Sequence, residues 1–332
     1  HMNENSDKKL EKLISLCKRR GYIFQSSEIY GGFGAYDYGP LGIELKNNIK
    51  QAWWKMFVTS RADMFGLDAS ILMHPKIWEA SGHLKNFSDP LVDCKQCKKR
   101  FRADHILEMS PAEMRGDSHK SSGSLDKLGI GLKKICPECS GELTPAKNFN
   151  LMFKTSIGPV EDDGATAYLR PETAGGIFVN FKNVAQSMRA RIPFGIGQIG
   201  KAFRNEITTE NWIFRTREFE QMEIEYFVHP DTWQEHFEHW LGVMKKWCEF
   251  LGIKNENLYL HEIAADALAH YSKRTIDFEF KYPFGTKELY GLAYRTNYDL
   301  KKHAEVSGED LTYTDPQTNQ KYIPHVIEPS LG

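Results

Sequence analysis

The chain has 332 residues, of which 41% are hydrophobic and 26% charged, a composition typical of a folded globular protein with one large or about two smaller domains. Its 43 Lys and Arg residues nearly balance 44 Asp and Glu residues, which argues against a globally basic nucleic-acid-binding protein. No apolar run approaches the roughly 18 residues of a membrane helix, and the charged N-terminus lacks the apolar segment of a secretion signal. We therefore expect a cytoplasmic protein with no membrane partner.

Hydrophobic spacing predicts the main elements in chain order. Residues 6–20 predict an amphipathic helix, because apolar side chains recur at three-to-four spacing before a glycine. A second, longer helix is expected after Pro40, since proline suits the first turn of a helix. The apolar stretch 66–73 predicts a strand, and an aromatic stripe at helical spacing predicts a helix over 233–251.

Four of the six cysteines form two Cys-x-x-Cys pairs separated by a long segment. Four thiolates at this spacing are typical of a closed structural zinc site, with Zn–S bonds of about 2.3 Å, and the alternative is two redox dithiols or disulfides. We therefore expect a zinc-ribbon-like insert over 92–145, with a mobile excursion around its polar stretch 118–124. The predicted metal ligands are Cys94, Cys97, Cys136 and Cys139.

Basic residues crowd the first of these cysteine pairs. They are Lys95, Lys98, Lys99, Arg100 and Arg102, with no acidic residue among them. They form either a local contact for a phosphate backbone or an ordinary solvated surface, and the sequence leaves both open.

Two stretches of alternating polarity, 202–206 and 217–227, predict an antiparallel hairpin joined by the loop 208–216. Arg204 and Glu206 would share one face of the first strand. The polar residues that alternate with apolar ones in the second strand are Gln221, Glu223 and Glu225. These side chains form either a floor of fixed charges for a charged ligand or an outer face that is simply hydrated and salt-bridged.

The sequence Phe-Arg-Asn-Glu at 203–206, with the loop and strand that follow, resembles the second signature motif of class II aminoacyl-tRNA synthetases. Further short motifs, spread over nearly the whole chain, resemble the homodimeric glycyl-tRNA synthetases of that class. These motifs begin at Tyr38, Trp78, Asn148, Arg170, Arg295 and Glu328. The resemblance implies ATP-dependent activation of glycine to glycyl-adenylate and its transfer to tRNA(Gly).

The resemblance also implies an α+β fold, with a six- or seven-stranded antiparallel sheet flanked by helices. It divides the chain into 3–91 with the first motif, the insert 92–145 and a catalytic core over 146–332. The first motif is a dimer contact in that family and corresponds here to the helix after Pro40 and a strand near 71–75. We therefore expect a homodimer.

The ATP site implied by the resemblance is centred on Arg204, which would contact the α-phosphate together with Mg²⁺. Arg204 and Glu206 are the implied catalytic residues. Attack of a carboxylate on phosphorus depends on alignment and charge stabilisation rather than on a protein nucleophile, which suits such a pair. The other implied ATP contacts are Asn205, Phe214, Arg215, Thr216, Arg217, Glu218, Phe219, Glu288, Leu289 and Gly332.

For glycine, the resemblance places Glu172 and Glu223 around the ammonium group, with Ser330 in the same pocket. Steric exclusion in a rigid pocket would then reject alanine. The remaining implied substrate contacts are Arg102, Phe219, Glu220, Gln221, Met222, Arg295 and Glu328. For Arg102 and Arg295, a structural salt bridge is the alternative.

The chain departs from the family pattern in two places. Gly175 stands where the family has glutamine, which affects a contact in the pocket. The sequence stops at Gly332, before the third motif is complete and without the anticodon-binding domain, so we expect weak activity from this piece alone. Two other functions stay open at this point: a zinc-containing nucleic-acid-binding protein without aminoacylation activity, and a synthetase-like paralogue that acts on another carboxylate.

Overall fold

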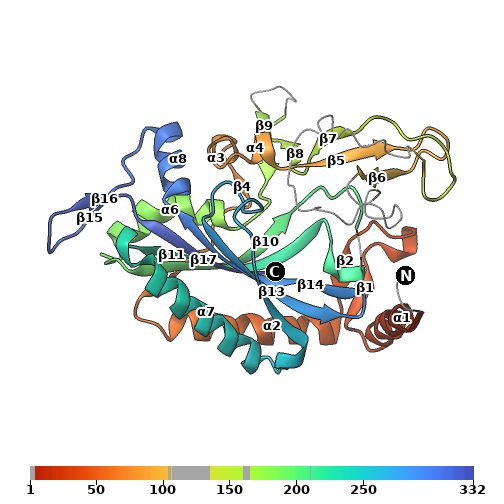
Figure 1. Cartoon of the computed structure of the whole chain (residues 1–332), viewed down its shortest axis with the longest axis horizontal. Coiled ribbons are helices and arrows are strands. Elements are labelled where there is room, and N and C mark those ends of the chain that lie inside the picture. The colour runs from red at the N-terminus through yellow and green to blue at the C-terminus, as the bar shows by residue number, and fades with distance from the viewer. Residues whose placement is uncertain (1–3, 104–105, 107–134, 160–164, 210) are drawn as a thin grey trace.

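A seven-stranded sheet forms the centre of the computed structural model, which describes residues 4–103, 106, 135–159, 165–209 and 211–332 (Figure 1). The strands are β12 (Leu258–Glu262), β13 (Arg274–Tyr282), β14 (Gly285–Thr296), β17 (His325–Leu331), β11 (Glu218–Val228), β10 (Phe194–Phe203) and β3 (Met64–Gly66), in this spatial order. All neighbours pair antiparallel except β3, which runs parallel to β10. The expected antiparallel sheet is confirmed, with one parallel edge strand.

Helices cover both faces of this sheet (Figure 1). They are α2 (Pro40–Trp54), α7 (Trp233–Phe250), α6 (Ala174–Ser187) and α8 (Tyr298–Ser307). α2 and α7 bury a large aromatic core against one face, in which Trp53 and Trp240 are fully buried. α6 and α8 bury a second core, including Phe178 and Leu300, against the opposite face. Burial of each such large side chain contributes about 1.5–3 kcal/mol, so both layers hold the sheet rigidly.

The predicted helices are confirmed close to their expected bounds. The first is α1 (Glu4–Arg19), α2 begins at Pro40, and α7 spans the aromatic stripe. In α7, Phe237 and Trp247 are completely buried, as the three-to-four spacing requires of a core-facing stripe.

The single strand predicted over 66–73 is wrong. The chain there forms β3, which ends at Gly66, and the separate strand β4 (Leu72–Met73). β4 belongs to a different sheet, where it pairs with β9 (Thr166–Leu169), which in turn pairs with β8 (Phe153–Ser156). Apolar character alone could not show that the intervening residues cross from one sheet to another.

The predicted hairpin is confirmed, but its first strand is shorter at the loop end than expected. β10 and β11 pair antiparallel from Phe194 opposite Phe227 to Phe203 opposite Glu218. Arg204 and Glu206 follow the end of β10, so strand alternation does not set their directions.

A three-stranded sheet carries the cysteine pairs at its end. It consists of β6 (Arg100–Arg102), β5 (Ser88–Asp93) and β7 (Lys147–Asn150). The polar stretch 118–124 lies outside the described residues. The smaller elements are β1 (Ile23–Gln25), β2 (Tyr36–Tyr38), β15 (Tyr313–Thr314), β16 (Lys321–Tyr322), α3 (Lys76–Ala80) and α4 (His83–Asn86).

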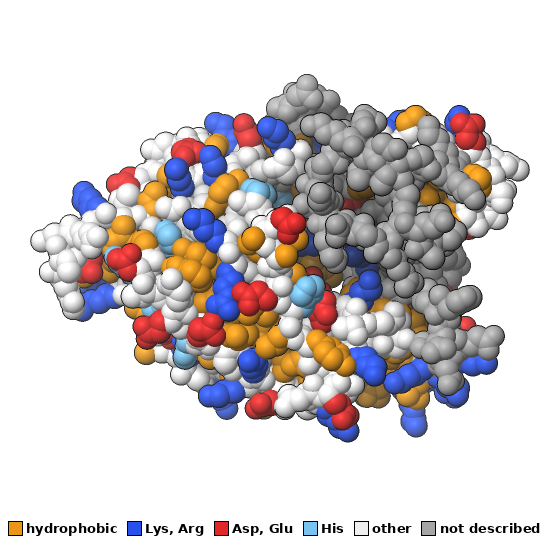
Figure 2. All heavy atoms as spheres, viewed as in Figure 1, with side chains coloured by type: hydrophobic (Ala, Val, Ile, Leu, Met, Phe, Trp, Pro, Cys, Tyr) orange, Lys and Arg blue, Asp and Glu red, His pale blue; other side chains and the backbone are white. Residues whose placement is uncertain are grey.

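Charged side chains of both signs are interspersed over the face shown in Figure 2. This pattern agrees with the near-zero net charge of the sequence. Within the described residues, no helix combines the length and the apolar character that a membrane span requires.

Candidate active site

Buried carboxylates on β11 form the floor of the candidate site. Alternate residues of β11 face α6, while the others face α2 and α7. Glu223, on the α6 side, is 2% exposed and accepts hydrogen bonds from Thr173 Oγ1 and from Ser330 Oγ, the latter at 3.1 Å. Burial, and next the neighbouring Glu172, raise the pKa of Glu223. A cation bound at this position would oppose both effects and favour the ionised form of Glu223.

Glu172, in the loop before α6, supplies a second carboxylate. His83 Nε2 lies 3.5 Å from Glu172 Oε2, and His83 Nδ1 lies 2.7 Å from Ser81 Oγ. Burial alone would raise the pKa of Glu172, but His83, Arg295 and Arg204 together lower it to about 2. Glu172 is thus ionised at neutral pH.

Arg295 forms a buried ion-pair network beside these carboxylates. Its Nε and Nη2 atoms donate to the two carboxylate oxygens of Asp299, each at 2.8 Å, and its Nη1 atom donates to Glu328. Its guanidinium lies 3.9 Å from the ring centroid of Tyr271. Burial raises the pKa of Glu328 to about 8, with Arg295 opposing and Glu223 adding to the rise. Arg295 and Glu328 therefore belong to the wall of the pocket and are held by contacts within the protein.

Arg204 is positioned by its backbone and by two aromatic rings. Its N–H donates to Arg217 O at 2.9 Å, and its Nε atom donates to Pro171 O at 3.1 Å. Its guanidinium carbon lies 5.4 Å from the ring centroid of Phe87 and 5.3 Å from that of Phe219. Within the described residues, its Nη atoms have no hydrogen-bond partner, so they are available to an anionic ligand.

Glu206 lies among further charged groups next to Arg204. Arg215 Nη1 is 3.7 Å from Glu206 Oε2, and Arg102 Nη1 donates to Asp89 Oδ2 at 2.5 Å nearby. Burial raises the pKa of Glu206, Arg215 opposes this rise and Asp89 adds to it. Arg102 thus forms the salt bridge that the sequence analysis gave as an alternative. Its positive charge nevertheless also opposes the rise in the pKa of Glu206.

Glu288 on β14 joins the same side of the site. Burial raises its pKa, and the charges of Arg204 and Arg215 oppose that rise. The neighbouring Leu289 instead packs against the aromatic core. On the loop, the Phe214 ring contacts Tyr282 edge-on, at 5.1 Å between centroids.

Three further loop residues hold the backbone between β10 and β11. Asn205 N donates to Leu151 O at 2.7 Å, and Thr216 Oγ1 donates to Glu218 O at 2.8 Å. Arg217 Nε donates to Glu206 O at 3.1 Å. These contacts fix the loop on which Arg204 and Arg215 are mounted.

Three residues of β11 that were expected in the site face away from it. Glu220 pairs with Lys46 at 2.5 Å and Lys50 at 2.8 Å on α2, and Met222 packs in the aromatic core. Glu218 contacts Lys201 on the exposed edge. Strand alternation explains the separation, since these three lie on the opposite face from Glu223.

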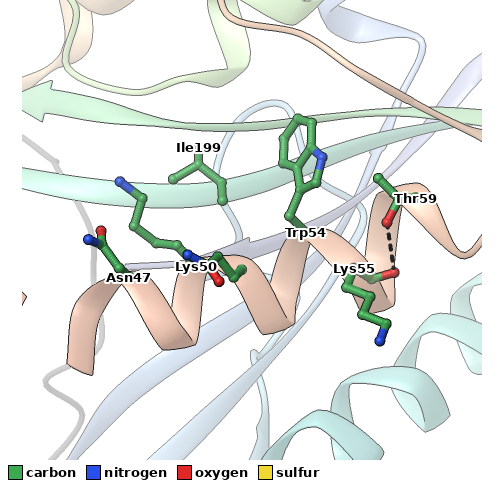
Figure 3. A pocket seen from close by; sticks show the side chains of 7 residues that line it. Asn47, Lys50, Trp54, Lys55, Thr59 and Ile199 are labelled. Carbon is green, nitrogen blue, oxygen red and sulfur yellow. Dashed lines mark hydrogen bonds between the residues drawn. The ribbon is translucent and has the colours of Figure 1, made fainter. Parts of the chain in front are cut away.

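A surface hollow of 530 Å³ lies on the α2 side of the sheet (Figure 3). Its lining includes Lys50, Trp54 and Ile199. It shares no residue with the carboxylate pocket, so it does not correspond to the predicted site. Gly332, the last residue of the sequence, is exposed, and a Cβ atom built there would meet no atom within 4 Å.

The unexpected Gly175 is accommodated by a close approach of α6 to α3. A Cβ atom at Gly175 would lie 3.0 Å from Trp78 Cζ3, tighter than ordinary contact. The Trp78 ring therefore occupies the space beside this position.

Several residues of the site were not predicted. His83, Thr173, Phe87 and Asp89 contact predicted site residues. His83 and Thr173 lie within the family-like motifs at 78–83 and 170–174, so these motifs could have identified them as site residues. Phe87 and Asp89 lie in no such motif, and only the packing of β5 against the loop after β10 reveals them.

The four cysteines of the two pairs converge on one point. Their Sγ atoms all lie within 4.8 Å of one another, and the Cys94–Cys139 and Cys97–Cys136 Sγ distances are 3.4 and 3.7 Å. A tetrahedral zinc with bonds of about 2.3 Å would set such distances near 3.8 Å, whereas a disulfide would set them near 2.05 Å. The donor set and its spacing fit zinc, and all four thiols are free.

The basic residues around the first cysteine pair meet acids from elsewhere in the chain. Lys95 pairs with Glu142 at 2.7 Å, Lys99 contacts Glu138, and Arg100 pairs with Asp93 at 3.1 Å. These exposed pairs favour the interpretation as ordinary surface.

Comparison with known proteins defines the class. Residues 153–307 match the sequence model of the tRNA synthetase class II core domain (G, H, P, S and T). The solved structure of the Giardia lamblia prolyl-tRNA synthetase in complex with prolyl-adenylate is similar at a TM-score of 0.62 over 99% of this chain and 51% of that chain. At 11% identity this likeness shows the fold alone. Fold and family match together define a class II aminoacyl-tRNA synthetase core, which uses ATP and Mg²⁺.

Glycine–tRNA ligases are similar over almost the whole chain. The Treponema denticola protein is 55% identical over 97% of this chain, and the Clostridium acetobutylicum and Geobacillus kaustophilus proteins are 55% and 53% identical over 98% and 97%. This chain spans 68, 72 and 71% of their respective lengths. The chain belongs to the glycine–tRNA ligase family, a family of ligases whose substrates are glycine and tRNA(Gly).

Proposed function

We propose that the buried carboxylates of this pocket bind the ammonium group of glycine during its activation. Glu223 supports this proposal most strongly. It is buried, it accepts hydrogen bonds from two hydroxyl groups, and within the described residues it has no salt bridge to a cation. The ionised Glu172 adds a second negative charge, and Ser330 holds Glu223 in place. Glycine offers only an ammonium, a carboxylate and small size, so such a site suits it.

The ATP side of the proposal rests on Arg204. Its Nη atoms would meet the α-phosphate, with Arg215 and Glu206 beside them and the Phe214 ring near the adenine. Mg²⁺ bound to ATP would offset charge on the departing pyrophosphate. The protein itself supplies alignment and fixed positive charge, which are the main requirements of phosphoryl chemistry.

Replacing Glu223 by glutamine tests the glycine site. Glu223→Gln should weaken glycine binding by about 1–3 kcal/mol, roughly 5- to 150-fold, because a charge-assisted contact becomes neutral. ATP–pyrophosphate exchange with glycine, alanine and serine is the measurement, and the Michaelis constant for ATP should change little. An exposed carboxylate variant, Glu256→Gln, is the control and should match the wild type. Unchanged glycine affinity in Glu223→Gln would remove Glu223 from the ammonium site.

We also propose that the four cysteines bind one structural zinc ion per chain. Cys94→Ser should lower the zinc content and loosen the three-stranded sheet of β5, β6 and β7, because the binding energy of a structural site is local folding energy. The main sheet should stay intact, since its cores lie elsewhere. Elemental analysis and hydrogen exchange measure the two effects. Wild-type protein without zinc, and with four freely titrating thiols under native conditions, would contradict this proposal.

A homodimer and a cytoplasmic location complete the proposal. Exposed apolar side chains on the N-terminal elements, including Ile29, Leu41 and Leu45, support an interface with a second copy. Sedimentation of the purified chain measures the oligomeric state. Translation takes place in the cytoplasm, and fluorescence microscopy of a tagged chain tests this location.

A further inference from the structure

Glu225 is a buried carboxyl group to which the proposed reaction gives no role. It is 0% exposed, and within the described residues neither of its oxygens has a hydrogen-bond partner. One carboxylate oxygen from each of Glu223, Glu225 and Glu328 lies within 4.8 Å of the others. A carboxyl group that meets mainly other carboxyl oxygens can form a hydrogen bond only if one of them carries a proton.

The charges around Glu225 do not balance when every carboxyl group is ionised. The titratable and charged groups near it are Glu223 on β11, Glu328 on β17, Arg295 on β14 and Asp299 on α8, with Glu172, His303 and Tyr271 beyond them. Among apolar neighbours, the Phe178 ring on α6 lies with its centroid 5.2 Å from the Arg295 guanidinium.

Among the residues that the structure describes, Arg295 is the one cation that pairs with this group of carboxyls, and it is shared between Asp299 and Glu328. If Glu223, Glu225, Glu328 and Asp299 were all ionised, the cluster with Arg295 would carry a net charge of −3 in a buried space. Such a charge is strongly unfavourable. Burial, followed by the charge of Glu328, raises the pKa of Glu225 well above its ordinary value. The free protein therefore holds at least one proton in this cluster.

We propose that Glu225 is a positioning residue of the glycine pocket, which shares a proton with Glu328 in the free protein and releases it to solvent when the ammonium group of glycine binds. This inference rests on the proposed role of Glu223. The ammonium adds a positive charge beside the cluster, so the ionised forms of its carboxyl groups become favourable. The protonated Glu225 meanwhile keeps Glu328 in place to accept the hydrogen bond from Arg295.

The sign of the pH effect follows from linkage. The free protein binds a proton that the glycine complex lacks, so glycine affinity increases as the pH rises. Between pH 6 and about 8, the value to which burial raises the pKa of Glu328, affinity should rise by up to about tenfold per unit. Glycine stays zwitterionic throughout this range and contributes no slope of its own.

Calorimetric titration with glycine, in two buffers of different ionisation enthalpy, measures the protons released on binding. The wild type should release between about one half and one proton at pH 7. Glu225→Gln should bind glycine with almost no release and with a flat pH profile, because a glutamine amide donates permanently to Glu328. Glu256→Gln, an exposed control, should behave as the wild type.

Equal proton release by the wild type and by Glu225→Gln would overturn the inference, as would glycine binding by the wild type without any release. If Glu225→Gln does not fold, the pH profile of the wild type alone still decides whether binding releases a proton. Failure of the proposed glycine site gives a different result, namely that Glu223→Gln binds glycine as tightly as the wild type.

Discussion

Replacing Arg204 by glutamine should lower kcat for glycyl-adenylate formation by about 100- to 1,000-fold, the usual loss when one fixed charge or donor at a developing charge is removed. The Nη atoms of Arg204 have no hydrogen-bond partner within the described residues, and the rings of Phe87 and Phe219 hold the guanidinium in place. The charge is therefore positioned before the substrate arrives. ATP–pyrophosphate exchange at saturating ATP and glycine is the measurement.

The matched control is Arg191→Gln. Arg191 is an exposed arginine just before β10, so its loss should change kcat less than twofold. The glycine Michaelis constant of Arg204→Gln should change far less than its kcat, because Arg204 contacts phosphate in this scheme. A kcat within about threefold of the wild type would show that Arg204 is only a structural residue between two rings.

Replacing Arg295 by methionine should lower the free energy of unfolding by about 3–5 kcal/mol at neutral pH. The side chain of Arg295 is 3% exposed, and its removal leaves Asp299 and Glu328 buried without their cation. Urea denaturation of both proteins gives the difference. Arg274→Met is the control, since Arg274 pairs with the exposed acids Glu238 and Glu262 and should cost less than about 1 kcal/mol through those pairs.

The loss in Arg295→Met should also depend on pH. Glu328 already has a folded-state pKa of about 8 against an ordinary value of 4.5, and loss of the cation raises it further. An acid whose folded pKa is raised binds more protons in the folded state, so it stabilises the fold below that pKa and the contribution is lost as the pH rises. Below about pH 8 Glu328 is protonated in both folded proteins, so the difference in stability between variant and wild type should be constant from pH 8 down to 4.5. It should grow only as the pH rises above 8, where Glu328 ionises in the wild type but not yet in the variant. A small, pH-independent difference would contradict the network.

The sequence by itself determined the local features of this protein. The aromatic spacing of α7, the start of α2 at Pro40 and the alternation along β11 all depend on neighbours within a few residues, and the structure confirms them. The resemblance of short motifs likewise pointed to the glycine–tRNA ligase family, which the comparisons show. The convergence of Cys94 with Cys139 was also expected from the spacing of the two Cys-x-x-Cys pairs.

Only the tertiary structure decided which side chains meet. Glu220 and Glu223 are three residues apart, yet one pairs with lysines of α2 and the other faces Thr173, because the sheet separates odd from even positions. The end of β10 before Arg204 depends on where pairing with β11 stops. The buried cluster around Glu225 forms from strands and a helix that are distant in sequence. No local sequence pattern shows how many charged groups are buried together there. Packing fixes that number, and the balance of burial and charge then determines where the protons lie.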